Sequence, residues 1–188
     1  MSLPLTPGTW TLDRSHATVA FTVRHMAISK VRGTFSGVDA TLTVGDTMED
    51  SVLSAVVDLS TVNTGNPDRD NHLRGSDFFN VATQPAMTFQ STRIHQNSDG
   101  GFVVDGMLTL NGRSNPLTLT VELHGTQTYP MDDSTHAGFS ATGSLSRRDY
   151  GIDFNVPMAT GGLVIGDRVG IELDVQLVAA KSDAEVTG

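Results

Sequence analysis

Apolar residues recur at every second position through most of this chain, and this alternation constrains its fold more than any other feature. Val19, Phe21 and Val23, for example, alternate with mostly polar neighbours, which gives a strand with one apolar and one hydrated face. The same pattern predicts about nine strands in an all-β fold. They are residues 8–13, 19–23, 31–44, 51–59, 86–94, 102–110, 117–124, 139–145 and 169–178.

Glycine and asparagine mark the places where these strands are interrupted or connected. The inward phase of residues 31–44 changes from odd to even positions at Ser36-Gly37, where a β-bulge would return the same face to the interior. Residues 97–101, Asn111-Gly112 and Gly161-Gly162 favour the positive φ angles of tight hairpins. We therefore expect neighbouring strands to pair in antiparallel fashion.

One segment, at about residues 66–75, breaks the strand pattern and predicts a short helix. Asn66 suits the N-cap position, Pro67 suits the first helical residue, and Gly75 suits the end of the helix. The apolar pair Phe78-Phe79 follows at once, as in a lid over an apolar cavity. A connecting helix packed on the end of a barrel accounts for the same pattern equally well.

A long antiparallel sheet with one apolar face must close into a barrel or fold into a sandwich to hide that face. Gly8-Thr9-Trp10 matches the G-x-W element found where lipocalin-type barrels close. We therefore expect an antiparallel, lipocalin-like β-barrel of eight strands, with the helix near its mouth. It forms one domain at residues 1–180, followed by a flexible C-terminal tail at residues 181–188.

Charge and composition exclude several classes of function. A net charge of −9 disfavours binding to nucleic acid and to anionic membrane surfaces, so no nucleic-acid partner is expected. Without cysteine, the chain cannot form a disulfide or a thiolate metal site. The start of the chain does not resemble a signal peptide, and no apolar run reaches the length of a membrane span. These features predict a cytoplasmic protein with no integral membrane segment.

The sequence shows no sign of a catalytic centre, either in the spacing of its histidines or in known catalytic motifs. The six histidines have no metal-ligand spacing, and the chain contains neither a G-x-S-x-G elbow nor a phosphate-binding glycine loop. We therefore expect no catalytic residue, no metal and no cofactor. His25 shares the inward phase of Phe21 and Val23, so its ring is expected to meet either a ligand or a backbone carbonyl at the end of its strand.

Arginines near the predicted barrel ends allow two interpretations each. Arg69 and His72 lie three residues apart on one helix face, where they suit the polar head of a ligand. Alternatively, Arg69 pairs with Asp13 or Asp77. Arg147 is expected either to stack on Trp10 and close the barrel, which we favour, or to bind an anionic head. These three side chains are candidate ligand contacts.

Several motifs, in the same order, resemble those of the YceI-like family of polyisoprenoid-binding barrels. They are W-T-L-D-R-S-H at 10–16, V-A-F-T-V-R-H-M at 19–26, V-R-G-T-F-S-G at 31–37, R-D-N-H-L at 69–73, D-F-F at 77–79, P-A-M-T-F at 85–89, G-M-L-T-L-N-G at 106–112 and R-R-D-Y-G-I at 147–152. The resemblance implies a barrel whose central tunnel holds a long-chain lipid, such as an isoprenoid quinone, a polyprenyl diphosphate or a fatty amide. An apolar tunnel is sufficient for micromolar binding of such a tail.

The expected function is therefore the non-enzymatic carriage or storage of an isoprenoid lipid. Glycines at inward positions, Gly33, Gly106 and Gly143, are expected to leave room for it, and Phe78 and Phe79 to gate the tunnel. The expected tunnel lining is Phe21, Val23, His25, Phe35, Met87, Phe89, Leu108, Leu110 and Phe139. Two alternatives are an enzyme or redox accessory that uses His25 or His72, and a barrel with a fully packed interior. The sequence leaves the oligomeric state open, including a homodimer.

Overall fold

A computed structural model describes residues 4–180 of the chain, and it consists of strands with one short α-helix. The predicted C-terminal tail lies outside the described residues. The strands are β1 Gly8–His25, β2 Ser29–Phe35, β3 Val38–Val44, β4 Val52–Asp58, β5 Val62–Asn63, β6 Ala86–Gln96, β7 Phe102–Leu110, β8 Arg113–Thr128, β9 Thr135–Ser146 and β10 Ile165–Ala179. Helix α1 spans Pro67–Arg74, and two 3₁₀ turns, η1 and η2, span Leu59–Thr61 and Arg147–Tyr150.

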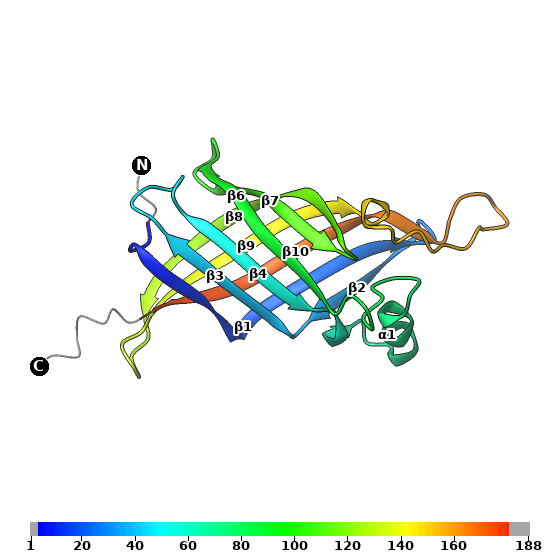
Figure 1. Cartoon of the computed structure of the whole chain (residues 1–188), viewed down its shortest axis with the longest axis horizontal. Helices are drawn as coiled ribbons and strands as arrows, with labels where there is room; N and C mark the ends of the chain where they lie inside the picture. The colour runs from blue at the N-terminus through cyan, green and yellow to red at the C-terminus, as the bar shows by residue number, and fades with distance from the viewer. Residues whose placement is uncertain (1–3, 181–188) are drawn as a thin grey trace, which may run out of the picture.

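The sheet closes on itself through an antiparallel pairing of its last strand, β10, with its first, β1 (Figure 1). Strands β2 and β3 pair with successive parts of β1 and together count as one strand of the barrel wall, while the two residues of β5 follow β4 and pair with the end of β2. Counted in this way, the barrel has eight strands, all antiparallel to their neighbours. The expected lipocalin-like barrel of eight strands is confirmed. Within residues 4–180, no helix has the length and apolarity needed to cross a bilayer.

The first strand is longer than the sequence predicts, because the expected strands at 8–13 and 19–23 are continuous. Leu12 lies opposite Leu177 in β10 and Ala17 lies opposite Val175, so residues 13–16 bulge from β1. Within this bulge, Asp13 accepts hydrogen bonds from the Ser15 hydroxyl and from the His16 ring at 2.5 and 2.8 Å. These hydrogen bonds, that of Ser15 first, lower the pKa of Asp13 to about 2.

At Ser36-Gly37 the structure has a break between β2 and β3 where the sequence suggested a bulge within one strand. The Gly37 N–H donates to Thr61 Oγ1 at 3.0 Å, and a Cβ at position 37 would lie 2.8 Å from Thr61 Cγ2. The close approach of η1 therefore requires glycine here. Phe35 and Val38 on either side of the break are both buried, so the apolar face continues as expected.

The turns and the helix follow the sequence signals closely. Asn111 and Gly112 have φ angles of 51° and 71°, which form a tight hairpin between β7 and β8. The side chain of Asn66 accepts a hydrogen bond from the N–H of Arg69 at 3.1 Å, so it caps α1 as predicted. The helix lies beside one end of the barrel (Figure 1), which we call the α1 end.

Trp10 defines the opposite end of the barrel. Its ring is buried, and its Nε1–H donates to the carbonyl of Thr6 at 3.0 Å. Ala179 lies opposite Trp10 in β10. We call this the Trp10 end.

Candidate functional site

The barrel encloses an elongated cavity of about 490 Å³. Its lining extends from Leu5 and Leu12 near the Trp10 end to His25 and Phe154 at the α1 end. Most lining residues are apolar. Among the described residues, the charged and imidazole side chains that line the cavity are Arg24, His25, Arg69, His72 and Arg147. The interior is therefore not filled by side chains, which excludes the packed-barrel alternative.

The structure places all fourteen side chains that the sequence predicts for ligand binding on the wall of this cavity. They are Phe21, Val23, His25, Phe35, Arg69, His72, Phe78, Phe79, Met87, Phe89, Leu108, Leu110, Phe139 and Arg147. The cavity thus gathers them in one place, and their contact with a ligand remains a prediction.

The inward glycines act differently from the expectation that they leave open space. A Cβ at Gly33 would lie 2.3 Å from Cζ of Phe21, its partner across the β1–β2 ladder. At Gly106 a Cβ would meet the ring of Phe89 at the same distance. Gly33 and Gly106 are therefore each covered by an aromatic ring that lies against the barrel wall, whereas a Cβ at Gly143 would meet Cδ2 of Leu119 at 2.8 Å. Gly33 and Gly106 keep the cavity open indirectly, because a side chain in their place would push these rings inward.

Substituting Gly106 by alanine is expected to destabilise the barrel by about 1–3 kcal/mol, the usual cost of overpacking. The new Cβ would meet the backbone oxygen of Gln90 at 2.6 Å as well as the Phe89 ring, so the strain cannot be relieved by rotating one side chain. Gly33→Ala is the matched control, because the two closest atoms at Gly33 belong to the Phe21 ring. Urea denaturation of both variants measures the difference. Equal stability of Gly106→Ala and the wild type would contradict this account of the wall.

An aromatic cluster occupies the α1 end of the cavity. His72 on α1 contacts Phe78 and Phe154 edge-to-face, with ring centroids 5.0 and 4.9 Å apart. The ring of Phe79 lies 5.9 Å from that of Phe35 in the barrel wall. Phe78 and Phe79 thus lie at one end of the cavity, with His72 and Phe154 in the same cluster, and their role as a gate stays a prediction.

The polar contacts of α1 differ from those expected for Arg69. Its Nε donates to Thr64 Oγ1 at 2.7 Å, and its Nη2 donates to the Thr64 carbonyl at 2.9 Å. The Thr64 hydroxyl in turn donates to Asp70 at 2.6 Å. Pairing of Arg69 with Asp13 or Asp77 was therefore wrong. Asp13 is held in the β1 bulge, and Asp77 lies 2.9 Å from Nε2 of His72.

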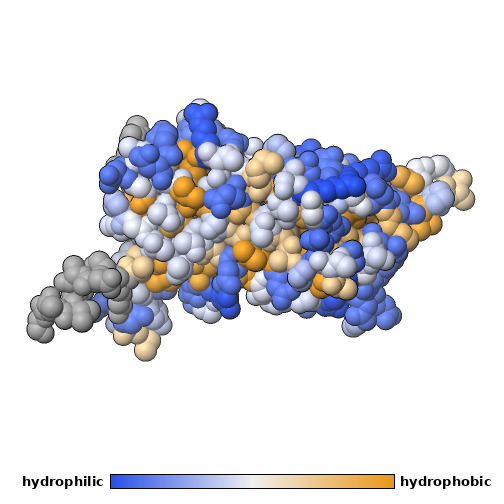
Figure 2. All heavy atoms as spheres, in the orientation of Figure 1, coloured by the Kyte–Doolittle hydropathy of each residue, from blue (hydrophilic) through white to orange (hydrophobic). Residues whose placement is uncertain are grey.

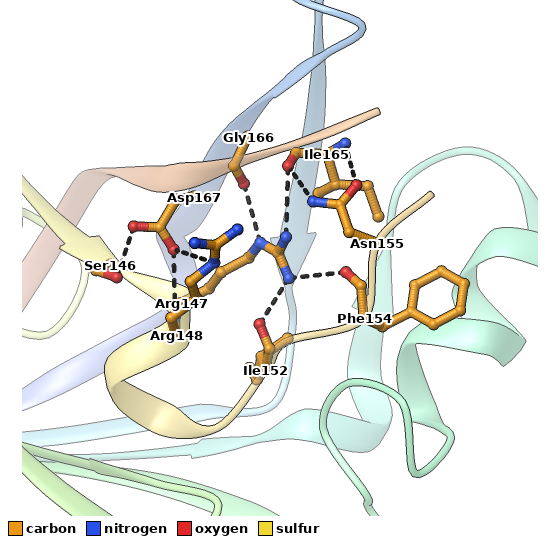
Figure 3. A network of polar contacts seen from close by, with 9 residues as sticks. All are labelled: Ser146, Arg147, Arg148, Ile152, Phe154, Asn155, Ile165, Gly166 and Asp167. Atoms are coloured by element: carbon orange, nitrogen blue, oxygen red, sulfur yellow. Dashed lines mark hydrogen bonds and ion pairs between the residues drawn. The ribbon is translucent and has the colours of Figure 1, made fainter. Parts of the chain in front are cut away.

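Arg147 crosses the α1 end of the barrel as a buried cation that binds backbone carbonyls (Figure 3). Its guanidinium donates to the carbonyls of Ile152 and Phe154 at 2.6 and 3.0 Å. It also donates to the carbonyls of Gly166 and Ile165 at 2.9 and 3.4 Å. Burial lowers the pKa of Arg147, and the nearby carboxylate of Asp167 partly offsets this. Arg147 thereby fastens residues 152–166 to the end of β9.

The expected stacking of Arg147 on Trp10 was wrong, because the two residues lie at opposite ends of the barrel. Ser146, which precedes Arg147, pairs with Arg168 at the start of β10, whereas Trp10 pairs with Ala179 at its end. The Trp10 ring finds its polar partner in Thr6 instead.

His25, at the end of β1, lines the cavity and is partly exposed. Its ring makes no hydrogen bond to any residue within 4–180, so the backbone carbonyl weighed as its partner is not found in that range. Arg24 beside it likewise has no ion pair among the described residues. These two side chains at the mouth are available to a ligand.

Sequence reasoning missed the part of the site formed by residues 152–165. Phe154, Val156 and Val164 line the cavity from the irregular segment between η2 and β10, and Ile165 is the first residue of β10, which begins before the predicted strand at 169–178. The available signal was composition, because no charged residue occurs from 154 to 166. A long uncharged segment next to an arginine-rich turn indicates apolar contacts that alternation cannot show.

Comparison with known proteins identifies relatives that cover nearly the whole chain. The model of the YceI-like domain matches residues 10–177. A UPF0312 protein of Staphylococcus aureus is 36% identical over 169 residues, which are 89% of this chain and 95% of that protein. A UPF0312 protein of Staphylococcus epidermidis is 36% identical over 166 residues, 87% of this chain and 94% of that protein.

Three solved structures share the fold. BcnA of Burkholderia cenocepacia has a TM-score of 0.74 at 19% identity and covers 90% of this chain and 99% of its own. The YceI protein of Campylobacter jejuni has a TM-score of 0.70 at 26% identity, with coverage of 84% and 90%. A polyisoprenoid-binding domain from Saccharophagus degradans has a TM-score of 0.65 at 16% identity, with coverage of 91% and 98%. The barrel, its sequence motifs and these matches together show that the chain belongs to the YceI-like family.

Proposed function

We propose that this protein binds a long-chain isoprenoid lipid in the barrel cavity and carries or stores it without chemical change. The observation that carries the proposal is the shape and polarity of the cavity, which is elongated, apolar along its length and about 490 Å³ in volume. Each buried methylene contributes about 0.8 kcal/mol, so ten of them supply roughly 8 kcal/mol before ordering costs. Because 1 μM corresponds to about 8 kcal/mol net, a prenyl tail that buries more than ten methylenes reaches micromolar affinity without any contact to its head.

The distribution of polar side chains supports one orientation of the lipid. The basic and imidazole side chains of the lining, among them His25 and Arg69, lie at the α1 end, whereas Leu5 and Leu12 lie toward the Trp10 end. We therefore place the head of the lipid at the α1 end and its tail toward Trp10. An isoprenoid quinone and a polyprenyl diphosphate both fit this arrangement. The structural neighbour from Saccharophagus degradans, described as a polyisoprenoid-binding domain, favours an isoprenoid tail.

The partners of Arg147, Arg69 and His72 favour carriage over catalysis by these three side chains, which leaves His25 as the remaining candidate acid or base among the described lining residues. Arg147 is engaged by backbone carbonyls and Arg69 by Thr64, contacts that hold loops in place. The His72 ring lies between two phenylalanine rings with its Nε2 beside Asp77. An acid or base for chemistry on a lipid head needs a free ring nitrogen that faces the head, and this arrangement directs Nε2 of His72 to a carboxylate.

Native mass spectrometry of the full chain, purified without detergent from a host that makes isoprenoids, tests the proposal. We expect a bound species whose mass identifies a prenyl lipid, at one lipid per chain. Protein stripped of lipid is then expected to take up a fluorescent prenyl probe at micromolar concentration. If no lipid copurifies and stripped protein takes up no probe, the proposed function is wrong.

A further inference from the structure

Two neighbouring loops project from the α1 end beyond the cavity mouth. They are the turn at residues 26–28 between β1 and β2 and the loop at residues 156–164 before β10. Figure 1 shows the second loop in orange at the right, with the blue β1–β2 turn beside it. The N–H of Met26 donates to the carbonyl of Val164 at 2.7 Å, which joins the two loops. We call residues 26–28 and 156–164 the apolar tip.

The apolar tip exposes large hydrophobic side chains to solvent. Ile28 is 80% exposed and Leu163 is 42% exposed, and Met26 and Val156 are exposed as well. No charged residue interrupts the chain from 154 to 166. In Figure 2 this right-hand extremity shows hydrophobic residues in orange and tan. Clusters of exposed apolar side chains on a domain mark sites of contact with another protein or with a membrane.

The backbone of the turn strengthens this interpretation. Met26 and Ala27 have φ angles of 52° and 58°, in the left-handed region that favours asparagine and glycine in tight hairpins. Each such residue costs about 1–2 kcal/mol when it is not glycine. The Asn111-Gly112 turn of the same barrel has the favoured residues. The β1–β2 turn therefore has apolar residues at positions where tight turns favour asparagine and glycine. Backbone strain of this kind is typical of functional sites.

The charge of the surrounding chain is opposite to that of the whole protein. Residues 24–32 contain Arg24, Lys30 and Arg32 and no acid. Arg32 pairs with Glu172 at 2.6 Å, whereas Arg24 and Lys30 have no ion pair among the described residues. Residues 151–168 add two aspartates and one arginine, so the two segments together with Glu172, the partner of Arg32, carry a net charge of +1 in a chain of −9. At physiological salt, the repulsion between an anionic surface at the apolar tip and acidic residues more than about 10 Å away is largely screened.

We propose that the apolar tip docks on an anionic lipid bilayer, with Ile28 and Leu163 inserted into its surface. This inference rests on the proposed lipid-binding function. Val156 and Val164 belong to the apolar tip and also line the cavity, so a docked tip brings the mouth of the cavity to the bilayer. An uncharged apolar loop with basic residues beside it suits insertion at an anionic interface. A lipid then passes between bilayer and barrel without exposing its tail to water.

Cosedimentation with vesicles made of equal parts phosphatidylglycerol and phosphatidylcholine tests the docking. We expect the full chain to sediment with these vesicles, and Ile28→Ser combined with Leu163→Ser to weaken binding by at least about tenfold. Met131→Ser is the matched control, because Met131 is 82% exposed in the β8–β9 turn at the Trp10 end. Binding is expected to weaken with Lys30→Gln and with pure phosphatidylcholine. Equal binding to both kinds of vesicle would overturn the anionic part of the proposal.

Tryptophan fluorescence gives a second, positional readout. A tryptophan introduced by Ile28→Trp is expected to shift to the blue on vesicles and to be quenched by brominated lipid. Met131→Trp, at the opposite end, is expected to show neither effect. The only tryptophan of the chain, Trp10, is buried at that same end and contributes a constant background. Quenching at position 131 in place of 28 would overturn the assignment of the tip.

Uptake of a prenyl probe added without vesicles separates failure of this inference from failure of the proposed function. Neither Ile28 nor Leu163 lines the cavity, so the double serine variant is expected to bind the probe as the wild type does. A wild type that binds the probe but no vesicles would overturn the docking and leave the proposed function intact. A concentration-dependent dimer that the double substitution abolishes, without vesicle binding, would assign the tip to contact between copies and also overturn the docking.

Discussion

Arg147→Met is expected to lower the melting temperature by about 10 °C. Arg147 is 3% exposed, and the substitution keeps much of its apolar stem while it removes the guanidinium that donates to four backbone carbonyls. A buried carbonyl that loses its donor costs about 1–3 kcal/mol, and water that enters the gap recovers part of this. A net loss of about 3 kcal/mol remains. For a chain of this size, each kcal/mol lowers the melting temperature by roughly 2–4 °C.

Arg148→Met is the matched control for this prediction. Arg148 is the next residue and half-exposed, and its Nε lies 3.8 Å from Asp167. An exposed ion pair of this kind contributes about 0–1 kcal/mol, so the control is expected to unfold close to the wild type. Calorimetry of the two variants measures the difference. Similar melting temperatures for Arg147→Met and Arg148→Met would show that residues 152–166 are held in place without Arg147.

The alternation of apolar residues predicted the barrel and its cavity because the face to which a strand residue points depends only on its position within that strand. In a strand, successive side chains point to opposite faces, so a single known inward residue fixes the direction of its neighbours. Phe21, Val23 and His25 were placed on the interior in this way, and they line the cavity. The cap of α1 was predictable for the same reason, since an N-cap depends on residues within one turn.

The positions of side chains at the barrel ends depend on a count of strands, and one error in that count reverses them. Each antiparallel strand runs opposite to the one before it, so dividing Gly8–His25 into two strands inverts the direction of every later strand. This inversion would bring Arg147 to the same end as Trp10. The bulge at residues 13–16 keeps β1 continuous, and Arg147 lies at the α1 end instead.

The partners of charged side chains were not predictable, because they are backbone groups of irregular segments. Arg69 binds the Thr64 backbone and hydroxyl, and Arg147 binds carbonyls up to 19 residues away in the chain. The sequence shows which carboxylates exist, so pairing with Asp13 or Asp77 was the natural expectation. It does not show where loop carbonyls converge. The role of Gly33 was hidden for a related reason, since its neighbour Phe21 is defined only by the register of β1 and β2.

Ala141→Phe is expected to weaken binding of a fluorescent prenyl probe by at least about 100-fold. Ala141 on β9 is a small residue that lines the cavity, between Val121 and Leu173 on the adjacent strands. A phenyl group in its place occupies space that the proposed function assigns to the lipid tail. Each displaced methylene costs about 0.8 kcal/mol, so displacing four costs roughly 3 kcal/mol, which corresponds to about 100-fold in affinity.

Thr142→Phe provides the control, because Thr142 is the next residue on β9 and faces the outside of the barrel. It adds nearly the same bulk without entering the cavity, so the probe is expected to bind it as it binds the wild type. Ala55→Phe, from β4 on another part of the wall, repeats the test should Ala141→Phe fail to fold. Unchanged affinity in folded Ala141→Phe and Ala55→Phe would place the lipid elsewhere. A loss confined to these two variants would locate it in the barrel, since bulk on the outer face cannot exclude a ligand held inside.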